Sequence, residues 1–375
     1  RERSKMWYDG ARAIVDRWSA RFELEPSTIA GVMAVLSPQK DWFMNVSLAE
    51  RVLTVMTEQQ DFAYSAEMGE TAGRIFSQPQ YQADVEAMQG KTLAELETTR
   101  QKAMFVRIYD ETYNDRGHRI VTPEGTFAEW QTTKKGVKSK TGWGSLTEIG
   151  KAVSVLEDNS PQNISTQMGG QHKVRNFYNN IIAPHSEAGD VTIDTHAVAA
   201  GLLRPLAGAS TEVIHNFGGT GSASSALTGV QGTYGIYAEA YRRAAAERGI
   251  LPREMQSITW EAVRGLFEAG WKGQKKNVQA AEAIWQKYRQ GKLSYANARE
   301  QITKLAGGIG SPAWVGHSVG SVNAKQDSSY QDQLPEAGVS RGVAAGVDGR
   351  TGVDVAADAA RLQQGETRLN QSVVN

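Results

Sequence analysis

The chain has 375 residues, and its 41 basic and 41 acidic side chains give a formal net charge of zero at neutral pH. This balance excludes a protein that is basic throughout, although a local basic face would still suit nucleic acid. The absence of cysteine excludes disulfides, thiolate catalysis, zinc fingers and cysteine-bound iron–sulfur clusters. No apolar run approaches the roughly 18 residues of a membrane span, so we expect no membrane partner.

The chain has neither an initiator methionine at its first position nor the apolar stretch of a signal peptide. We therefore expect a piece of a longer polypeptide, produced by processing or by trimming for expression. The length allows two or three domains, or one large core followed by a tail.

Helical periodicity dominates the first part of the chain. Apolar residues recur at helical spacing over residues 7–22. Pro26 suits the start of a second, strongly apolar helix, which Pro38 interrupts. A third helix is expected over residues 41–56.

The next hundred residues change character twice. Residues 57–115 predict several short polar helices, whereas residues 117–143 combine β-branched residues, a Pro-Glu-Gly turn and four lysines. This second composition predicts a hairpin or a loop. Ser145 and Glu148 then form a capping-box pattern that predicts another helix over residues 145–158.

The remaining chain is predicted to be helical until about residue 307. Asp194 or Thr195 suits the first cap of a helix, and the Gly/Ser/Thr-rich stretch 205–231 predicts a loop with helical fragments. Tyr234, Tyr237 and Tyr241 have helical spacing and are expected in the core. Further helices are predicted over 173–182, 234–249, 252–267, 274–291 and 294–308. Residues 308–375 are rich in Gly, Ser, Ala, Asp and Gln, which predicts a flexible linker or disordered tail.

Two charged residues stand out on otherwise apolar elements. Lys173 lies at a predicted helix start, where the helix dipole and partial burial favour the neutral, nucleophilic amine. Asp194 lies at the next helix start, where a carboxylate stays ionised. Such a pair facing one cleft suits attack on the anomeric carbon of a sugar, with the carboxylate stabilising positive charge or handling the proton. The alternative is a surface lysine and an ordinary helix cap.

The segments that carry this pair, "GGQHKVRNF" and "TIDTHA", resemble the helix-hairpin-helix DNA glycosylases, the superfamily of endonuclease III and 8-oxoguanine glycosylase. Members have a glycine-containing hairpin, a lysine and a helix, followed by a "VDTH"-like signature. The resemblance places the catalytic lysine on Lys173 and the aspartate on Asp194. We interpret the chain as a divergent, phage-encoded branch.

An upstream segment strengthens the resemblance. "AGVMAVLSPQKDWFMN" is similar to the family's "LSxQ" motif with its following asparagine, and the matching positions are Gln39 and Asn45. In the family this loop enters the duplex and fills the gap left by a flipped base. The pieces that resemble the family cover residues 7–56 and 145–268, so residues 57–144 would be an insertion that could include a β-hairpin.

The resemblance implies a mostly α, two-lobed helical glycosylase-like domain over residues 1–307, followed by the tail. It implies a DNA glycosylase of base-excision repair, with or without abasic-site lyase (AP lyase) activity, acting through Lys173 and Asp194. Its expected DNA-binding residues are Gln39, Trp42, Asn45, Gly169, Gly170, His172 and Arg175. The expected partner is double-stranded DNA, besides other domains of a longer phage polypeptide. The expected location is the host cytoplasm or the phage virion.

No cofactor or metal site is expected, although the hairpin could hold a monovalent cation. Trp42 could stack on a flipped base or belong to the core. Arg175 and the lysines of residues 134–140 could contact phosphates or simply face solvent. His196 is expected to pack or to form hydrogen bonds rather than to bind a metal.

Two alternatives stay open at this point. A phage enzyme of the same superfamily could modify a base without excising it. The long insertion and the irregular hairpin "MGGQHK" motivate this alternative, because the family pattern is L-P-G-apolar-G-x-K. The chain could also be a non-catalytic DNA-binding part of a virion or DNA-ejection protein, as the missing methionine and the tail suggest.

Overall fold

The structure is a computed structural model that describes residues 2–133, 135–217 and 232–310. All of these residues belong to one unit, which spans residues 1–333. The predicted tail lies outside the described residues except for residues 308–310, and so do residues 218–231 of the predicted loop 205–231.

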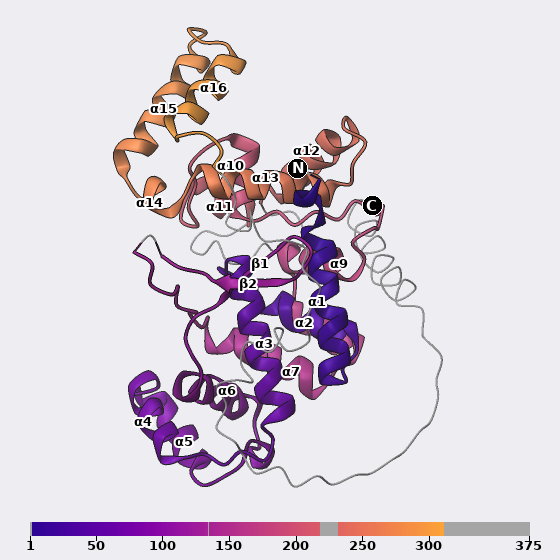
Figure 1. Cartoon of the computed structure of the whole chain (residues 1–375), viewed down its shortest axis with the longest axis vertical. Coiled ribbons are helices and arrows are strands. Elements are labelled where there is room, and N and C mark those ends of the chain that lie inside the picture. The colour runs from indigo at the N-terminus through magenta and orange to yellow at the C-terminus, as the bar shows by residue number, and fades with distance from the viewer. Residues whose placement is uncertain (1, 134, 218–231, 311–375) are drawn as a thin grey trace, which may run out of the picture. The chain divides into compact units, whose positions relative to one another are not determined.

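The described residues are mostly helical, as the sequence predicts (Figure 1). The first helices are α1 (Trp7–Phe22), α2 (Pro26–Val35), α3 (Trp42–Glu58), α4 (Ala66–Ile75), α5 (Pro79–Met88), α6 (Thr99–Tyr113), α7 (Leu146–Glu157) and α8 (Pro161–Met168). They are followed by α9 (His172–Ile182), α10 (Thr195–Leu202), α11 (Thr211–Asn216), α12 (Tyr234–Ala246), α13 (Pro252–Leu266), α14 (Ala269–Lys272), α15 (Lys275–Arg289) and α16 (Tyr295–Leu305). Two short 3-10 helices are η1 (Arg3–Met6) and η2 (Leu93–Glu95), and the strands are β1 (Arg119–Val121) and β2 (Phe127–Trp130).

Helix α2 forms the centre of the first group of helices. Pro26 occupies its first turn, and every residue from Thr28 to Val35 is buried. An apolar helix with no polar face must be covered on all sides. Helices α1, α3, α7, α8 and α9 provide this cover. The Ser145–Glu148 capping box predicted for α7 is present and fixes its start.

Helices α8 and α9 are joined by a short turn. Gly169 ends α8 with φ 61° and ψ −153°, a conformation that side chains with a Cβ avoid. The Arg175 guanidinium reaches back from α9 to the carbonyl oxygens of Gly169 and Ser165. The turn thus sets the direction in which α9 leaves, and with it the position of Lys173.

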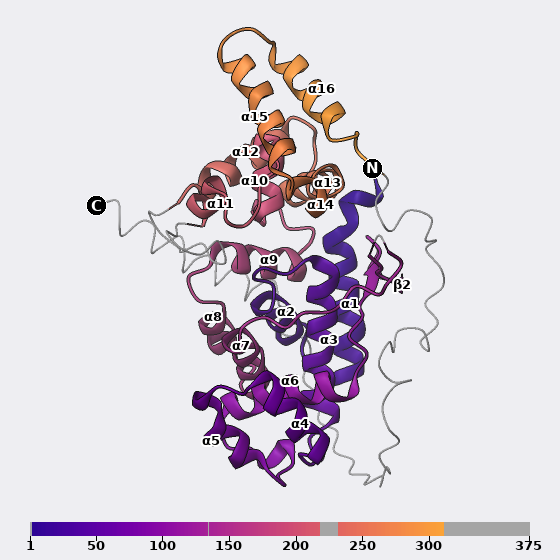
Figure 2. The same cartoon turned by 90° about the vertical axis from the view of Figure 1, so that its left-hand side faces the viewer.

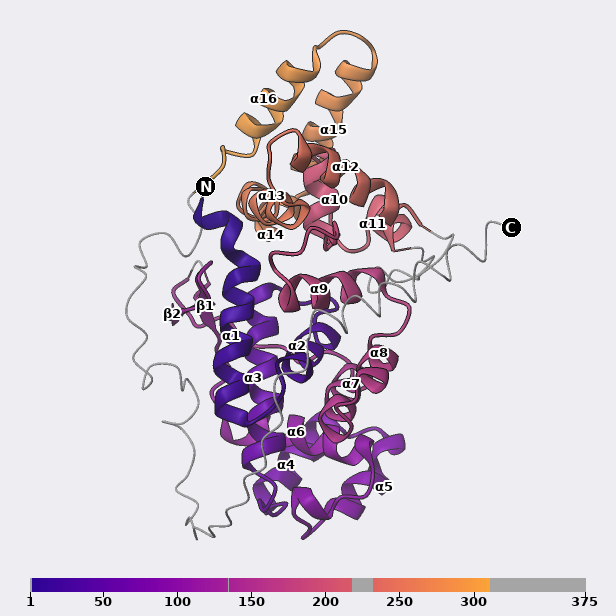
Figure 3. The ribbon, with the colours of Figure 1, turned by 90° about the vertical axis from the view of Figure 1, so that its right-hand side faces the viewer.

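Helices α10 to α16 surround a second cluster of buried apolar residues, drawn from residues 191–302. Tyr234 and Tyr241 belong to this core and Tyr237 packs against it, which confirms the prediction for the tyrosine stripe. Figures 2 and 3 show these helices on the far side of α9 from α7 and α8. Helix α1 reaches them as well, since Trp7 Nε1 donates to Glu261 on α13 at 3.0 Å.

The predicted hairpin is present, and two contacts hold it to the helices. Strands β1 and β2 pair antiparallel, and their turn lies directly against Gly10 of α1. A Cβ at position 10 would overlap the Pro123 carbonyl oxygen, so this helix position requires glycine. Beneath the hairpin the buried Arg51 forms an ion pair with Asp110 and donates to the Asp115 and Gly117 carbonyls.

Candidate active site

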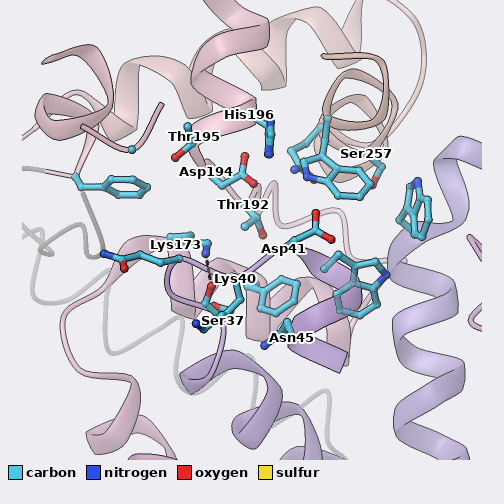
Figure 4. Close-up of a pocket in the computed structure, with 18 of the residues that line it drawn as sticks. Ser37, Lys40, Asp41, Asn45, Lys173, Thr192, Asp194, Thr195, His196 and Ser257 are labelled. Atoms are coloured by element: carbon cyan, nitrogen blue, oxygen red, sulfur yellow. Dashed lines mark hydrogen bonds between the residues drawn. The ribbon is translucent and has the colours of Figure 1, made fainter. Parts of the chain in front are cut away.

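A cavity of about 630 Å³ lies where the two groups of helices meet. Its walls come from α1, the connection between α2 and α3, the start of α3, the first two turns of α9, the start of α10, the segment around α11, and α13. Figure 4 shows the polar side chains of these segments pointing into one space. The predicted Lys173 and Asp194 both line it.

The amine of Lys173 is anchored to the backbone. Lys173 is the second residue of α9, and its Nζ donates to the Ser37 carbonyl oxygen at 2.9 Å. Burial lowers the pKa of Lys173, and the nearby carboxylates of Asp194 and Glu148 oppose this shift. Burial therefore favours the neutral amine, which is the nucleophilic form.

The Ser37 carbonyl is oriented by a tight turn. It also accepts a hydrogen bond from the Lys40 backbone N–H at 3.2 Å, which closes a four-residue turn. Pro38 has the restricted φ that suits the second position, and Gln39 adopts φ 56° at the third. The sequence "SPQK" thus turns one carbonyl toward Lys173.

Asp194 is fixed by its role as the N-cap of α10. Its carboxylate accepts a hydrogen bond from the Ala197 N–H at 2.7 Å, so Asp194 rather than Thr195, the other candidate from the sequence, is the cap. The segment before it is held by Tyr234, whose hydroxyl accepts from Ile193 N and donates to Val191 O. The carboxylate is therefore held rigidly in the same pocket as the amine (Figure 4).

Flat aromatic rings form much of the remaining wall. Trp42 and Phe177 meet edge to face at 6.0 Å between ring centroids, and Trp7 and Trp260 do so at 5.3 Å. The Tyr8 ring lies against Phe177. The Tyr8 hydroxyl donates to Gln256 Oε1 at 3.2 Å. These rings offer a planar ligand apolar faces on which it could stack.

His196 follows Asp194 and also lines the pocket. Its ring lies edge to face with Trp260, with the centroids 6.5 Å apart. Burial lowers the pKa of His196, against the opposing effect of Asp194. In the described part of the chain, no group of three histidine or carboxylate side chains is arranged to hold a metal ion.

Asp41 connects the two groups of helices at the pocket edge. It caps α3, and both its carboxylate oxygens accept from the Arg264 guanidinium of α13, at 2.8 and 2.9 Å. The same guanidinium lies over the rings of Phe43 and Trp260. The pocket walls on α3 and α13 are therefore fixed relative to each other.

The three residues predicted from the upstream motif differ in their exposure. Gln39, Trp42 and Asn45 all line the pocket, and Gln39 is exposed. Asn45 is only 2% exposed, and its Nδ2 donates to the Met33 carbonyl at 3.0 Å. A buried side chain cannot enter a duplex, so the family's duplex-inserting role does not fit Asn45. Of the three residues, only Gln39 is exposed.

The predicted hairpin residues lie beside the pocket rather than in its wall. Gly169, Gly170, His172 and Arg175 are absent from the lining. His172 stacks on Tyr234 with the ring centroids 5.1 Å apart, and burial lowers the pKa of His172. The Arg175 guanidinium is engaged by the carbonyls at the end of α8, which gives it a structural use.

The predicted basic run of residues 134–140 is partly engaged as well. Lys138 Nζ donates to Asp115 at 2.8 Å and lies 4.1 Å from the Trp130 ring centroid. Residue 134 lies outside the described residues. Phosphate contact by this run stays a prediction.

Several pocket residues could not be predicted from the sequence. Tyr8, Asp41, Ser257 and Trp260 reach the pocket only because α1, α3 and α13 pack together. Tyr8 and Gln256 are 248 positions apart along the chain. No local pattern marks such residues, although the helical spacing of α1 and α13 indicated which faces would be buried.

Comparison with known proteins adds a family but no activity. A family model described as "Family of unknown function (DUF7178)" matches residues 1–104 and 128–267. The pocket residues fall within these matched segments. No curated protein and no solved structure matches the chain.

Among the helices of the described residues, none is both long enough and apolar enough to cross a membrane.

Proposed function

Since the chain belongs to DUF7178, a family of unknown function, its activity has to be inferred from its own pocket, and we propose that it is a DNA glycosylase with abasic-site lyase activity. The observation that carries this proposal is the convergence of Lys173 and Asp194 in one cavity lined by aromatic rings. The resemblance of "LSPQ…N" and "GGQHK…IDTH" to the helix-hairpin-helix glycosylases supports it.

The proposed chemistry uses the two charged groups in sequence. Lys173 Nζ forms a bond to C1′ of the target sugar while the C1′–N bond to the base breaks, and the base leaves with the bonding electron pair. Asp194 stabilises the positive charge that develops at C1′ and accepts the proton that the amine loses. Asp194 then passes this proton to O4′ as the C1′–O4′ bond breaks, which opens the sugar ring and gives an iminium ion between Lys173 and the sugar, while the departed base takes a proton from water. Loss of a C2′ proton to the Asp194 carboxylate expels the 3′ phosphate and nicks the strand.

The pocket walls suit a base that has left the duplex. A flipped base is held by stacking against aromatic side chains and by hydrogen bonds to its edge. Trp42 and Phe177 offer the stacking surfaces, and the exposed Gln39 lies at the pocket where a duplex could be met. The proposal requires double-stranded DNA as partner, in the host cytoplasm or in a phage particle.

The test is borohydride trapping on a duplex with one abasic site. The wild-type protein should give a covalent adduct, and Lys173→Ala should give none. Lys272→Ala is a matched control, because burial also lowers the pKa of Lys272 and its Nζ also donates to a backbone carbonyl, that of Leu206. The control should keep the adduct.

Two results would overturn the proposal: no adduct with the wild-type protein, or an adduct that persists in Lys173→Ala. Mass spectrometry of the same reactions on intact duplexes separates excision from modification. Excision releases a free base, whereas a modification enzyme would leave a new nucleoside in the strand.

A further inference from the structure

The last three helices of the described chain are basic and lie outside the family match. The family model ends at residue 267, and residues 268–310 contain α14, α15 and α16. Eight lysine and arginine residues and three glutamates lie in this segment, whereas the chain as a whole is neutral. All of the basic residues except Lys272 are exposed. A local excess of positive charge attracts a polyanion even when the whole chain has no net charge.

The positive charge of this segment is not neutralised locally. The Glu282 carboxylate is already shared by Arg204 and Arg289. Within the part of the chain that the structure describes, Lys287 and Lys292 have no ion-pair partner. Exposed lysines of this kind are free to bind phosphate groups.

Two exposed tyrosine rings accompany these lysines. Tyr288 near the end of α15 and Tyr295 at the start of α16 lie 5.8 Å apart between ring centroids. Both rings pack on Trp285, at 5.7 and 6.0 Å. Trp285 Nε1 donates to the Leu203 carbonyl at 3.2 Å and so ties this ring cluster to the end of α10. Tyr288 is nevertheless 40% exposed and Tyr295 52% exposed, so ring surface is open to a ligand.

The two helices that carry the tyrosines are accessible. Helix α16 packs against α15, and Figure 2 shows the pair extending beyond the other helices. The Arg299 guanidinium of α16 lies 5.6 Å from the Tyr295 ring centroid, which adds positive charge beside the ring. The surface formed by α15 and α16 therefore combines flat rings with exposed cations.

This combination fits an unpaired nucleic-acid strand better than other polyanions. Bases of a single strand stack on aromatic rings while lysines bind the phosphates. In a duplex the neighbouring base pairs cover the faces of each base, so the tyrosines would have nothing to stack on. A second copy of the same surface is disfavoured because its charge has the same sign.

We propose that α15 and α16 bind a single-stranded nucleic acid, with bases stacked on Tyr288 and Tyr295 and phosphates bound by Lys287 and Lys292. This inference goes beyond the proposed function and does not rest on it, because none of these residues lines the pocket. If the proposed function holds as well, the chain has one site for a duplex and another for an unpaired strand.

The first experiment measures the fluorescence anisotropy of labelled strands. The probes are oligothymidine and oligouridine of about twelve nucleotides, a length within the range of single-strand sites. A tetrahydrofuran strand of the same length carries the phosphates without the bases. Binding of either base-containing strand is expected, with the tetrahydrofuran strand about fivefold or more weaker. The inference is overturned if neither strand binds, or if the tetrahydrofuran strand binds as tightly.

The second experiment removes one ring. Tyr295→Leu should weaken binding of the better strand by about fivefold or more, whereas Tyr295→Phe keeps the ring and should bind like the wild type. Tyr81→Leu on α5 is the matched control, because Tyr81 also packs on a ring, that of Phe76, and also lies beneath an arginine, Arg100. A loss in Tyr295→Leu no larger than in Tyr81→Leu would contradict the inference.

The third experiment tests the charges through the salt dependence of binding. Lys287→Gln with Lys292→Gln should reduce the slope of log affinity against log salt by about 1.4, since each phosphate contact on a single strand contributes about 0.7. Arg74→Gln with Arg243→Gln removes two exposed charges elsewhere and should leave the slope unchanged. An equal slope in both double variants would reject the lysines as phosphate ligands and with them the proposed surface.

A membrane is the rival partner for a basic surface with aromatic rings. Sedimentation with vesicles of phosphatidylcholine and phosphatidylserine in equal parts tests it. Vesicle binding that is lost in Tyr295→Leu, together with no strand binding, would assign the surface to lipid and overturn the inference.

The inference and the proposed function can fail separately. Borohydride trapping on an abasic duplex reports on Lys173, and Tyr295→Leu should leave it unchanged. Strand binding without an adduct would keep the α15–α16 surface and reject the glycosylase. An adduct without strand binding would do the reverse.

Discussion

Lys173 is held in a state that makes its chemistry sensitive to pH. Burial lowers its pKa below the ordinary value of 10.5, so the neutral amine forms at a lower pH than on a surface lysine. The trapping rate of the wild-type protein should therefore rise with pH through a midpoint below that value. A midpoint at or above it would show that another amine reacts.

Asp194→Asn should move this profile further. Because the carboxylate raises the pKa of Lys173, its removal should shift the midpoint to lower pH while the maximal rate falls. Asparagine still accepts the Ala197 N–H as a helix cap, so the fold should be kept. Asp194→Ala lacks the cap as well and should cost about 1 kcal/mol more in stability.

Lys173 should also lower the free energy of unfolding. A lowered pKa means that the unfolded chain binds the proton more tightly, so stability is lost as pH falls below the ordinary pKa of lysine. Lys173→Met should therefore leave the free energy of unfolding at pH 7 unchanged or higher, while trapping falls by about 10³-fold or more. Urea denaturation at pH 7 and pH 9 checks this. A clear loss of stability at pH 7 would mean that the Ser37 contact outweighs burial.

The sequence indicated the pair at the centre of the pocket but not its surroundings. Lys173, Asp194, Gln39, Trp42 and Asn45 were singled out from local motifs, and all of them line the cavity. The burial of Asn45 could not be foreseen, because it follows from the packing of α3 on α2. The partners that complete the pocket come from α1 and α13, and no local pattern links those helices to it.

At the level of elements, Gly10 lowers the intrinsic stability of helix α1. Alanine in a helix interior is ordinarily better than glycine by about 1 kcal/mol. At Gly10 the turn at Pro123 leaves no room for a Cβ, so Gly10→Ala should lower the free energy of unfolding by about 1–3 kcal/mol. Gly235, in α12 with nothing within 4 Å of a Cβ, is the control, and Gly235→Ala should stabilise. Thermal unfolding of both variants tests this prediction, and a Gly10→Ala variant as stable as the wild type would contradict it.

The β1–β2 hairpin is anchored by a buried charge pair between α3 and α6. Arg51 is fully buried, and Asp110 also accepts from Trp143 Nε1 at 2.9 Å. Arg51→Leu would leave Asp110 charged and buried, so we expect a loss of about 3–5 kcal/mol in unfolding free energy. The double variant Arg51→Leu with Asp110→Leu should recover much of this loss in chemical denaturation. No recovery would show that the hydrogen bonds of Arg51 to the hairpin carbonyls matter more than its charge.

Helical periodicity predicted most elements because it depends on local spacing. The long helices α1, α3, α13 and α15 were expected close to their observed bounds, and so was the hairpin. Helix α8 was not predicted. Its eight residues are mostly polar, and its start depends on Ser160, whose side chain accepts from Asn163 N. Short helices of this kind are stabilised by caps and neighbours rather than by an apolar stripe.

At the scale of the whole unit, the pocket depends on two groups of helices keeping one arrangement. The Asp41–Arg264 ion pair is about one-third exposed on each side. Arg264→Ala should therefore lower stability by only about 1 kcal/mol. It should slow trapping by about tenfold or more, because the walls on α3 and α13 lose their link. Arg243→Ala, which removes an exposed pair with Glu239, is the matched control and should change neither. Equal trapping in both variants would show that the walls are held in another way.

The contact between Gly10 and the hairpin turn has a consequence for the relatives of this chain. The family match breaks off at residue 104 and resumes at residue 128, so the turn at Pro123 belongs to the part that the family model does not cover. Gly10, in contrast, lies inside the matched part. A relative without this turn gains by replacing the glycine, whereas a relative with it must keep the glycine. The two features should therefore covary, and the residue at position 10 alone should show which members of the family carry the hairpin.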